Sequence, residues 1–222
     1  MAGVVRASGS WPTARWTEPG AEWGPRASRW RAICETSSMQ DLVEQYEARL
    51  AGILEAPDDL GRLEIIVRRP AENERELLDE GHLDMEVGLV GDRWARRDDR
   101  TPVYMLSQLT VISTRVLAAI EPDRERWPQA GDQLFVDLDL SEENLPTGSR
   151  LAIGTAVIEI SETPHTGCAK FSARFGSDAQ RWVNSPIGRF HRMRGLNATI
   201  VEPGTVRVGD TVRKVKAGDS PV

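Results

Sequence analysis

Short apolar runs separated by glycine, proline and aspartate make up most of the chain from residue 60 onward. Several of these runs alternate apolar and polar residues, which is typical of half-buried strands. The strands that we expect lie at residues 63–69, 86–90, 108–113, 133–140, 150–161 with a turn at Gly154, 195–202, 206–208 and 211–215. Many short strands at this spacing predict a mainly β fold with short helices (α+β), built as an antiparallel barrel or sandwich.

Helical periodicity is confined to a few short stretches. Residues 39–54 form an amphipathic segment whose apolar face consists of Leu42, Val43, Tyr46, Leu50 and either Ile53 or Leu54. Ser113 or Thr114 is expected to cap a helix that continues to Ile120, since both side chains are good N-caps. Residues 168–175 and 177–184 predict two more short helices, joined by Gly176.

Residues 1–38 have a different character. They contain four of the seven tryptophans and five arginines, without helical or strand periodicity. They also lack the continuous apolar stretch of a secretory signal. Two interpretations stay open: a disordered leader, or an upstream extension of a protein whose translation starts at Met39. We expect residues 39–216 to form a single domain and residues 217–222 to be a frayed tail.

Charge and cysteine content narrow the class of protein. The chain carries 28 basic and 34 acidic residues, a net charge of −6, whereas domains that bind nucleic acid usually have a basic surplus. No stretch reaches the roughly 18 consecutive apolar residues of a membrane span. Cys34 and Cys168 lie far apart, which excludes a disulfide framework. We therefore expect a cytoplasmic protein that binds neither nucleic acid nor a membrane.

Cys168 is the first candidate for chemistry. It follows Pro164 and Gly167 and opens an expected helix, where backbone N–H groups and the helix dipole favour a thiolate. Lys170 and His165 are expected to add positive potential, which would make the sulfur a better nucleophile and soft-metal ligand. The alternative is a cysteine buried as a small apolar residue. A zinc site at His165 and Cys168 is disfavoured, because no further ligand follows at a suitable spacing.

Two loops offer groups that bind anions or heterocycles. Asn144 and Thr147 lie in a Glu-Asn-Leu-Pro-Thr-Gly segment directly after a strand, and such a loop presents amide, hydroxyl and backbone donors. Arg93 follows Gly91 and Asp92 and can present its guanidinium to an oxyanion. Both segments are also ordinary turns. Glycine-rich phosphate loops, nucleophile elbows and His-Glu-x-x-His motifs are missing from the sequence.

Taken in order, these segments resemble the MOSC family, which is related to the C-terminal part of molybdenum cofactor sulfurase. The resemblance spans residues 63–215. It rests on six segments in the expected order, namely residues 88–93 (GLVGDR), 108–113 (QLTVIS), 131–148 (GDQL to ENLPTG), 151–157 (LAIGTAV), 168–170 (CAK) and 194–210 (RGL to GTVRVGD).

The resemblance implies a MOSC-type antiparallel β-barrel and the molybdenum cofactor (molybdopterin) as ligand. It implies that Cys168 binds molybdenum or carries sulfur, with Asn144, Thr147, Arg93, Lys170 and His165 as candidates for holding the cofactor. Relatives reduce N-hydroxylated compounds with electrons from a separate redox partner. Unlike multidomain relatives, the chain contains no pyridoxal-phosphate domain and no cysteine-rich iron–sulfur domain. The Pro-His-Thr-Gly loop before Cys168 also differs from the Arg-Pro-Cys loop of some relatives.

Three hypotheses follow. The first is a molybdenum-dependent oxidoreductase that reduces a small N-hydroxylated substrate and takes electrons from a separate protein. The second is a module without catalytic turnover, in which Cys168 holds the cofactor or the persulfide sulfur of a donor for delivery. The third is a metal-free barrel that binds a protein partner and whose Cys168 is buried and slow to alkylate.

Overall fold

The structure is a computed structural model that describes residues 48–96 and 101–216. The chain divides into two compact units, Met1–Glu44 and Gln45–Val222, and all described residues lie in the second. The leader predicted at residues 1–38, the first part of the amphipathic segment and the tail at residues 217–222 lie outside the described residues. None of the described helices is long and apolar enough to cross a bilayer.

A closed barrel forms the centre of this unit. Its strands run in the order β11 (Thr211–Val215), β7 (Arg150–Ile153), β8 (Ala156–Ile160), β9 (Leu196–Glu202), β5 (Leu109–Ser113), β6 (Leu134–Asp137) and β1 (Gly61–Arg68). Pairing of Gly61 with Val212 closes the barrel between β1 and β11, and β2 (Glu76–Leu78) extends the sheet beyond β1. The predicted mainly β, barrel-like fold is confirmed.

Two features of the sheets go beyond that prediction. β5 and β6 are parallel while the other described barrel pairs are antiparallel, because α4 (Thr114–Ile120) carries the chain across between them. A second sheet in the order β10 (Gly204–Arg207), β3 (Glu80–Asp84) and β4 (Gly88–Leu89) lies on one flank of the barrel. Sequence reasoning missed β2 and β3 and expected a longer strand at residues 86–90, since residues 76–84 are too polar to give a clear strand pattern.

The core occupies the inside of the barrel. Aliphatic side chains from all seven barrel strands meet there and are almost fully buried, because alternate residues of each strand point inward. The strand at residues 133–140 is shorter than predicted, but Leu138, Leu140 and Leu145 beyond its end still belong to this core. Burial of this apolar surface is the main force that closes the barrel.

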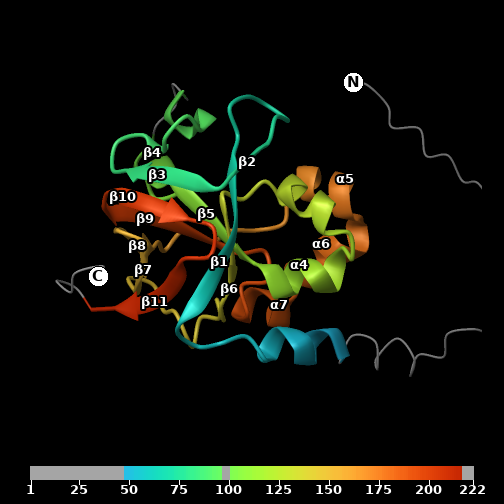
Figure 1. Cartoon of the computed structure of the whole chain (residues 1–222). Coiled ribbons are helices and arrows are strands. Elements are labelled where there is room, and N and C mark those ends of the chain that lie inside the picture. Colours follow the sequence, from blue (N-terminus) through green and yellow to red (C-terminus); the bar gives the residue numbers. More distant parts are fainter. Residues whose placement is uncertain (1–47, 97–100, 217–222) are drawn as a thin grey trace, which may run out of the picture. The chain divides into compact units, whose positions relative to one another are not determined.

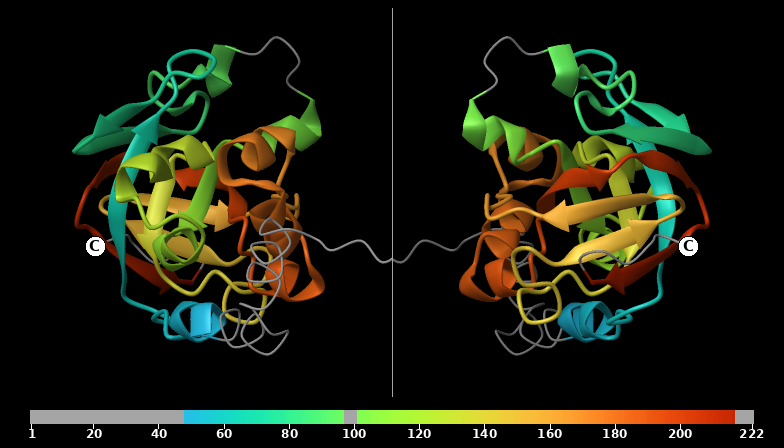
Figure 2. Two further views of the ribbon diagram at one scale, coloured as in Figure 1. Left: turned by 90° about the vertical axis from the view of Figure 1, so that its right-hand side faces the viewer. Right: turned by 90° about the vertical axis from the view of Figure 1, so that its left-hand side faces the viewer.

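The helices gather on one side of the barrel, as Figures 1 and 2 show for α4, α5 (Ala169–Phe175), α6 (Ser177–Val183) and α7 (Pro186–Phe190). α3 (Pro102–Met105) and two 3₁₀ helices, η1 (Arg93–Arg96) and η2 (Arg124–Ala130), complete the described set together with a helix at residues 48–54. The helices predicted at 168–175 and 177–184 are confirmed apart from their ends, whereas α7 was missed.

Two apolar clusters hold this side to the barrel. One packs Trp127 of η2 and Leu117 of α4 against the outer face of the barrel. The other joins Ile53 of the first helix to Phe171 of α5 and Val183 of α6. Ile53 therefore belongs to the apolar face of residues 48–54, while Leu54 is 55% exposed.

The prediction that a Ser113 or Thr114 side chain caps α4 is wrong. Ser113 occupies the N-cap position, but its side chain makes no capping hydrogen bond. The hydroxyl of Thr114 instead donates to the carbonyl of Val136 at 3.4 Å. Thr114 is the first helical residue rather than the N-cap, so α4 starts at the end of β5 without a side-chain cap.

Candidate functional site

Cys168 lies where a tightly held loop meets α5. The loop begins after β8 and is fixed by α6: Asn184 accepts from the N–H of Gly167 and donates to its carbonyl, both at 2.9 Å, and Gln180 donates to the same carbonyl at 3.1 Å. A Cβ at Gly167 would lie only 3.0 Å from Val183, which explains why glycine stands here. α6 therefore determines where the sulfur of Cys168 lies.

The thiol of Cys168 is exposed and has an altered acidity. Partial burial raises its pKa, but hydrogen bonds from the backbone N–H groups of Phe171 and Lys170 and the positive charge of Arg194 outweigh this. The net result is a pKa below the ordinary value of a thiol, which favours the thiolate. The hypothesis of a buried, inert cysteine does not fit this exposure.

A buried ion pair lies behind the loop. Asp132 is fully buried and accepts from Nη1 of Arg194 at 2.8 and 3.1 Å, while Nη2 of Arg194 donates to the carbonyl of Ala130 at 3.1 Å. The guanidinium of Arg194 also lies over the ring of Phe171, 4.9 Å from its centroid. The pair thus joins the turn before β6 to the start of β9 and to α5.

His165 contacts this pair without carrying a charge. Its Nδ1 lies 3.4 Å from Oδ1 of Asp132, too far for a strong hydrogen bond. Burial and the charge of Arg194 lower the pKa of His165 to about 3, despite the opposing effect of Asp132. The prediction that His165 adds positive potential near Cys168 is therefore wrong, because a histidine this deeply buried beside an arginine stays neutral.

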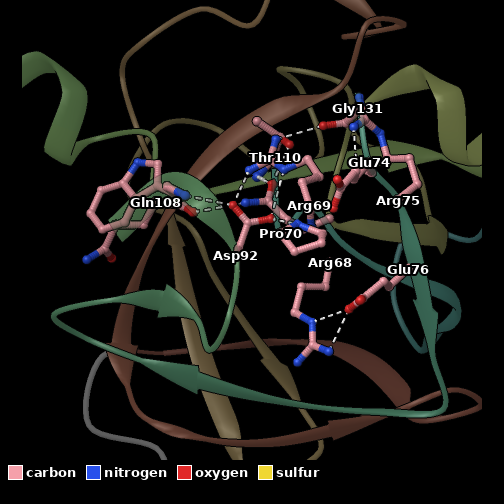
Figure 3. A network of polar contacts seen from close by, with 12 residues as sticks. Arg68, Arg69, Pro70, Glu74, Arg75, Glu76, Asp92, Gln108, Thr110 and Gly131 are labelled. Atoms are coloured by element: carbon pink, nitrogen blue, oxygen red, sulfur yellow. Dashed lines mark hydrogen bonds and ion pairs between the residues drawn. The ribbon is translucent and has the colours of Figure 1, made fainter. Parts of the chain in front are cut away.

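A second buried pair supports the loop that carries Arg93. Asp92 accepts from Nε and Nη2 of Arg69 at 2.9 and 3.0 Å and also from the backbone N–H of Trp94. Arg69 donates in addition to the carbonyl of Gly131 at 2.7 Å, and Figure 3 shows Arg69 between Asp92 and Gly131. Since Asp132 follows Gly131, the two ion pairs adjoin the same turn.

A cavity of about 300 Å³ opens between the loop before Cys168, α7 and the start of β9. Three of its lining residues have a buried polar atom without a hydrogen-bond partner among the described residues: Ser161 Oγ, His165 Nδ1 and Arg194 Nε. Such atoms are costly unless a ligand or water satisfies them. Arg194 is only 5% exposed, so its Nε–H group cannot be satisfied by bulk solvent.

The structure brings some of the predicted residues together and separates others. Thr147 and His165 both line the cavity. Lys170 lies on α5 next to Cys168 and pairs with Glu72, whose pKa is lowered by that hydrogen bond, by the charge of Lys170 and by Arg93. Arg93 and Lys170 thus lie on the same side of the molecule.

Asn144 does not line the cavity. Its amide donates to the carbonyls of Asp58 and Asp139 at 2.9 and 2.8 Å and accepts from Lys214 at 2.8 Å. These contacts tie the loop after β6 to β11. In this structure the side-chain amide of Asn144 makes its hydrogen bonds to other residues of the protein, and its contact with a cofactor stays a prediction.

Sequence reasoning missed Asp132 and Arg194, the two residues that most directly organise the site. Both lie in segments that were noted only as family anchors. Among the described residues, no group of three or more histidine, cysteine, aspartate or glutamate side chains is arranged to hold a metal ion.

The comparison with protein families decides the identity of the domain. The model of the MOSC domain matches residues 90–213, more than half of the chain. The chain belongs to the MOSC family. MOSC domains are associated with binding of the molybdenum cofactor. The match includes the Gly91-Asp92-Arg93 turn, both buried ion-pair carboxylates, the cavity loop and Cys168.

Two solved structures with TM-scores of at least 0.50 have a similar fold. A crystal structure of a hypothetical protein is 21% identical and covers 72% of this chain and 69% of that chain, with a TM-score of 0.51. YiiM from Geobacillus stearothermophilus is 14% identical and covers 73% and 78%, with a TM-score of 0.50. YiiM from Escherichia coli is 24% identical and covers 70% of each chain, with a TM-score of 0.47. A search of curated proteins found no match.

Proposed function

We propose that this MOSC protein binds the molybdenum cofactor through Cys168 and reduces small N-hydroxylated substrates with electrons from a separate protein. The observation that carries the proposal is the exposed thiol of Cys168, whose pKa is lowered. Cys168 follows Thr166 of the cavity wall by two positions in the chain, and that cavity contains buried polar atoms without hydrogen-bond partners. A thiolate is a soft ligand of the kind that molybdenum accepts. The family match supplies the identity of the cofactor.

The residues around the cavity fit such a ligand. Arg194 Nε and Ser161 Oγ can donate to a polar heterocycle, and neutral His165 can donate or accept through its ring nitrogens. Thr147 adds a hydroxyl at the cavity wall. Arg93 and Lys170 supply positive charge near Glu72, which suits the anionic end of the cofactor.

The chemistry divides between the cofactor and the chain. When bound, the cofactor would supply the two-electron redox chemistry that removal of the hydroxyl oxygen requires. Cys168 would hold the cofactor through its thiolate, while Arg194 keeps the Cys168 helix in place through Phe171 and Asp132 holds Arg194. Since the pKa of His165 is about 3, this residue is neutral at physiological pH and serves as a hydrogen-bonding group rather than a source of protons.

Reduction of an N-hydroxyl group to N–H and water takes two electrons and two protons. The protons come from solvent, and the electrons come from a redox partner, since the chain shows no further redox cofactor motif. The cytoplasmic location, the redox partner and the substrate class are parts of this proposal.

The test is to express the full chain in a host that makes the molybdenum cofactor and to measure molybdenum by mass spectrometry and pterin by fluorescence. We expect near-stoichiometric molybdenum in the wild type and in Cys34→Ser, and its loss in Cys168→Ser. Reduction of an amidoxime with an artificial electron donor then tests turnover. A folded wild-type protein without molybdenum would contradict the proposal.

The exposure of Cys168 also favours a second candidate, a sulfur carrier. An exposed thiolate is accessible to a donor protein, and Cys168 is not among the residues that line the 300 Å³ cavity. A carrier would show a persulfide on Cys168. The added sulfur atom would raise the intact mass by about 32 Da, and a thiol reductant would remove it. It would show no reductase turnover even when loaded with molybdenum.

A further inference from the structure

We propose that the hollow between Arg75 and Arg174 is a binding site for a phosphate group or a similar oxyanion, separate from the cofactor site at Cys168. The hollow has a volume of about 540 Å³ and lies between the loop before β2, η2 and the last turn of α5. Its walls share no residue with the cavity near Cys168. None of the residues predicted to hold the cofactor lines it.

The two guanidinium groups converge on one point. A Cβ placed on Gly131 would lie 3.5 Å from Nη2 of Arg75 and 3.5 Å from Nη1 of Arg174. Gly131 itself has a left-handed φ of 91° at the end of η2, a conformation that glycine adopts without strain. Figure 3 shows Arg75 beside Gly131. The bare Cα of Gly131 therefore lies beside the place where the two arginine forks approach each other.

Both arginines are fixed in place by backbone carbonyls. Arg75 donates to Pro128 at 3.2 Å and to Glu74 at 2.6 Å, and Arg174 donates to Gln129 at 2.8 Å. Among the described residues neither side chain has a carboxylate within ion-pair distance, and Arg174 also donates to the neutral amide oxygen of Asn73 at 3.3 Å. Neutral carbonyls orient the charges without neutralising them, so each fork keeps its capacity for an anion.

The charges repel one another in the absence of an anion. Burial, followed by the positive charges of Arg174, Arg69 and Arg93, lowers the pKa of Arg75, and Asp92 offsets this only in part. Asp92 is itself committed to Arg69. An oxyanion in the hollow would relieve this repulsion and accept hydrogen bonds from both forks, which is the arrangement by which arginine pairs recognise phosphate.

A small ligand fits better than an acidic protein. The two arginines flank a hollow rather than a flat surface. The apolar residues Leu77 and Pro128 also line this hollow. Glu125 also lines the hollow, so the site favours a single anionic group placed between the arginines over an acidic protein surface laid across all of its walls. A phosphorylated small molecule, with its phosphate between the arginines and an apolar part against Leu77, satisfies both the charge and the shape.

The experiment measures thermal stabilisation and calorimetric binding of inorganic phosphate and pyrophosphate, using the full chain from a host that makes no molybdenum cofactor and with chloride matched for ionic strength. We expect saturable stabilisation, with affinity reduced about tenfold or more in Arg75→Gln and Arg174→Gln. Arg181→Gln, which removes an exposed arginine paired with Asp178 on α6, is the matched control and keeps the wild-type affinity. Arg174→Lys keeps the charge without the fork and is expected to bind with intermediate affinity, which keeps the test valid if Arg174→Gln does not fold.

Three results would overturn the proposal. One is no saturable phosphate or pyrophosphate binding by the folded wild type. Another is binding that is unchanged in both arginine variants or reduced equally by Arg181→Gln. The third is binding of a penta-glutamate peptide to these arginines in the absence of phosphate binding, which would indicate a protein partner.

A last experiment distinguishes this phosphate site from the cofactor site. Protein loaded with molybdenum cofactor is expected to bind phosphate as the unloaded protein does, and Arg174→Gln is expected to keep its molybdenum. Loss of phosphate binding on loading, together with loss of molybdenum in Arg174→Gln, would assign the hollow to the phosphate of the cofactor and contradict a separate site. The phosphate measurements on the unloaded protein need no molybdenum, so they can fail while the function proposed for Cys168 stands, and the reverse also holds.

Discussion

The interior of the barrel is filled with aliphatic side chains such as Leu63, Leu151 and Val212, whereas the region between the barrel and the helices contains two buried carboxylates, Asp92 and Asp132, each paired with an arginine. Aliphatic packing stabilises the fold without fixing the direction of any one group. Charged hydrogen bonds are directional and are costly when one partner is lost. The helix side therefore fixes loops at defined positions, and that is where Cys168, the cavity and the arginine hollow lie.

The largest effect is expected from Asp132→Asn. This change leaves the buried charge of Arg194 without its partner, and the free energy of unfolding should fall by about 3–5 kcal/mol. Denaturant unfolding measures it. Asp137→Asn is the matched control, since the Asp137–Arg115 pair is about 30% exposed and should contribute less than about 1 kcal/mol. Equal losses in the two variants would contradict the contrast between the two regions.

Removal of an aliphatic side chain inside the barrel should destabilise the protein without touching the site. Leu151 is fully buried, so Leu151→Ala should lower the free energy of unfolding by about 3 kcal/mol through lost burial and the cavity left behind. The alkylation rate of Cys168 in the folded protein should stay at the wild-type value. A changed rate would show that the barrel interior and the site are coupled.

The neutral state of His165 predicts a dependence of stability on pH. Its folded pKa of about 3 lies below its unfolded value of about 6.5, so the unfolded chain binds the extra proton between these values. Stability contributed by neutral His165 is present above pH 6.5 and falls as the pH decreases, by about 1.4 kcal/mol per unit or about 2 kcal/mol by pH 5. Unfolding at pH 7 and pH 5 measures this, and His165→Asn should remove most of the difference.

The smallest effect is expected from Cys168→Ser. Because the side chain is exposed and its main contacts are backbone hydrogen bonds that a hydroxyl can also accept, the free energy of unfolding should change by less than about 0.5 kcal/mol. Thermal unfolding checks this. A loss of several kcal/mol would mean that Cys168 is a packing residue.

The barrel was largely predictable because most of its strands stand in the sequence as short apolar runs between turn residues. In β5 and β9 the structure buries the apolar residues Leu109, Val111, Ile112, Leu196, Ala198 and Ile200, together with the polar Ser113 and Asn197. The strands β2 and β3 were missed, since Glu76, Asp79, Glu80 and Asp84 hide the pattern. The parallel pair β5–β6 was also not foreseen, because local sequence does not state which strands pair.

The site was predictable only where a residue is reactive by itself. Cys168 was found from its type and its position before a helix. Asp132 and Arg194 lie 62 positions apart and form a pair that only the folded chain creates. The one local signal for Asp132 is a carboxylate directly before a buried strand, which resembles an ordinary Gly-Asp turn.

We infer that the backbone N–H groups of α5 and the charge of Arg194 hold Cys168 as a thiolate. Alkylation of Cys168 by iodoacetamide, followed by intact mass across pH in the Cys34→Ser chain, tests it with a single reporting thiol. The same chain unfolded in urea gives the reference. We expect the folded protein to reach half of its maximal alkylation rate at a lower pH than the unfolded chain. A midpoint equal to or above that of the unfolded chain would contradict it.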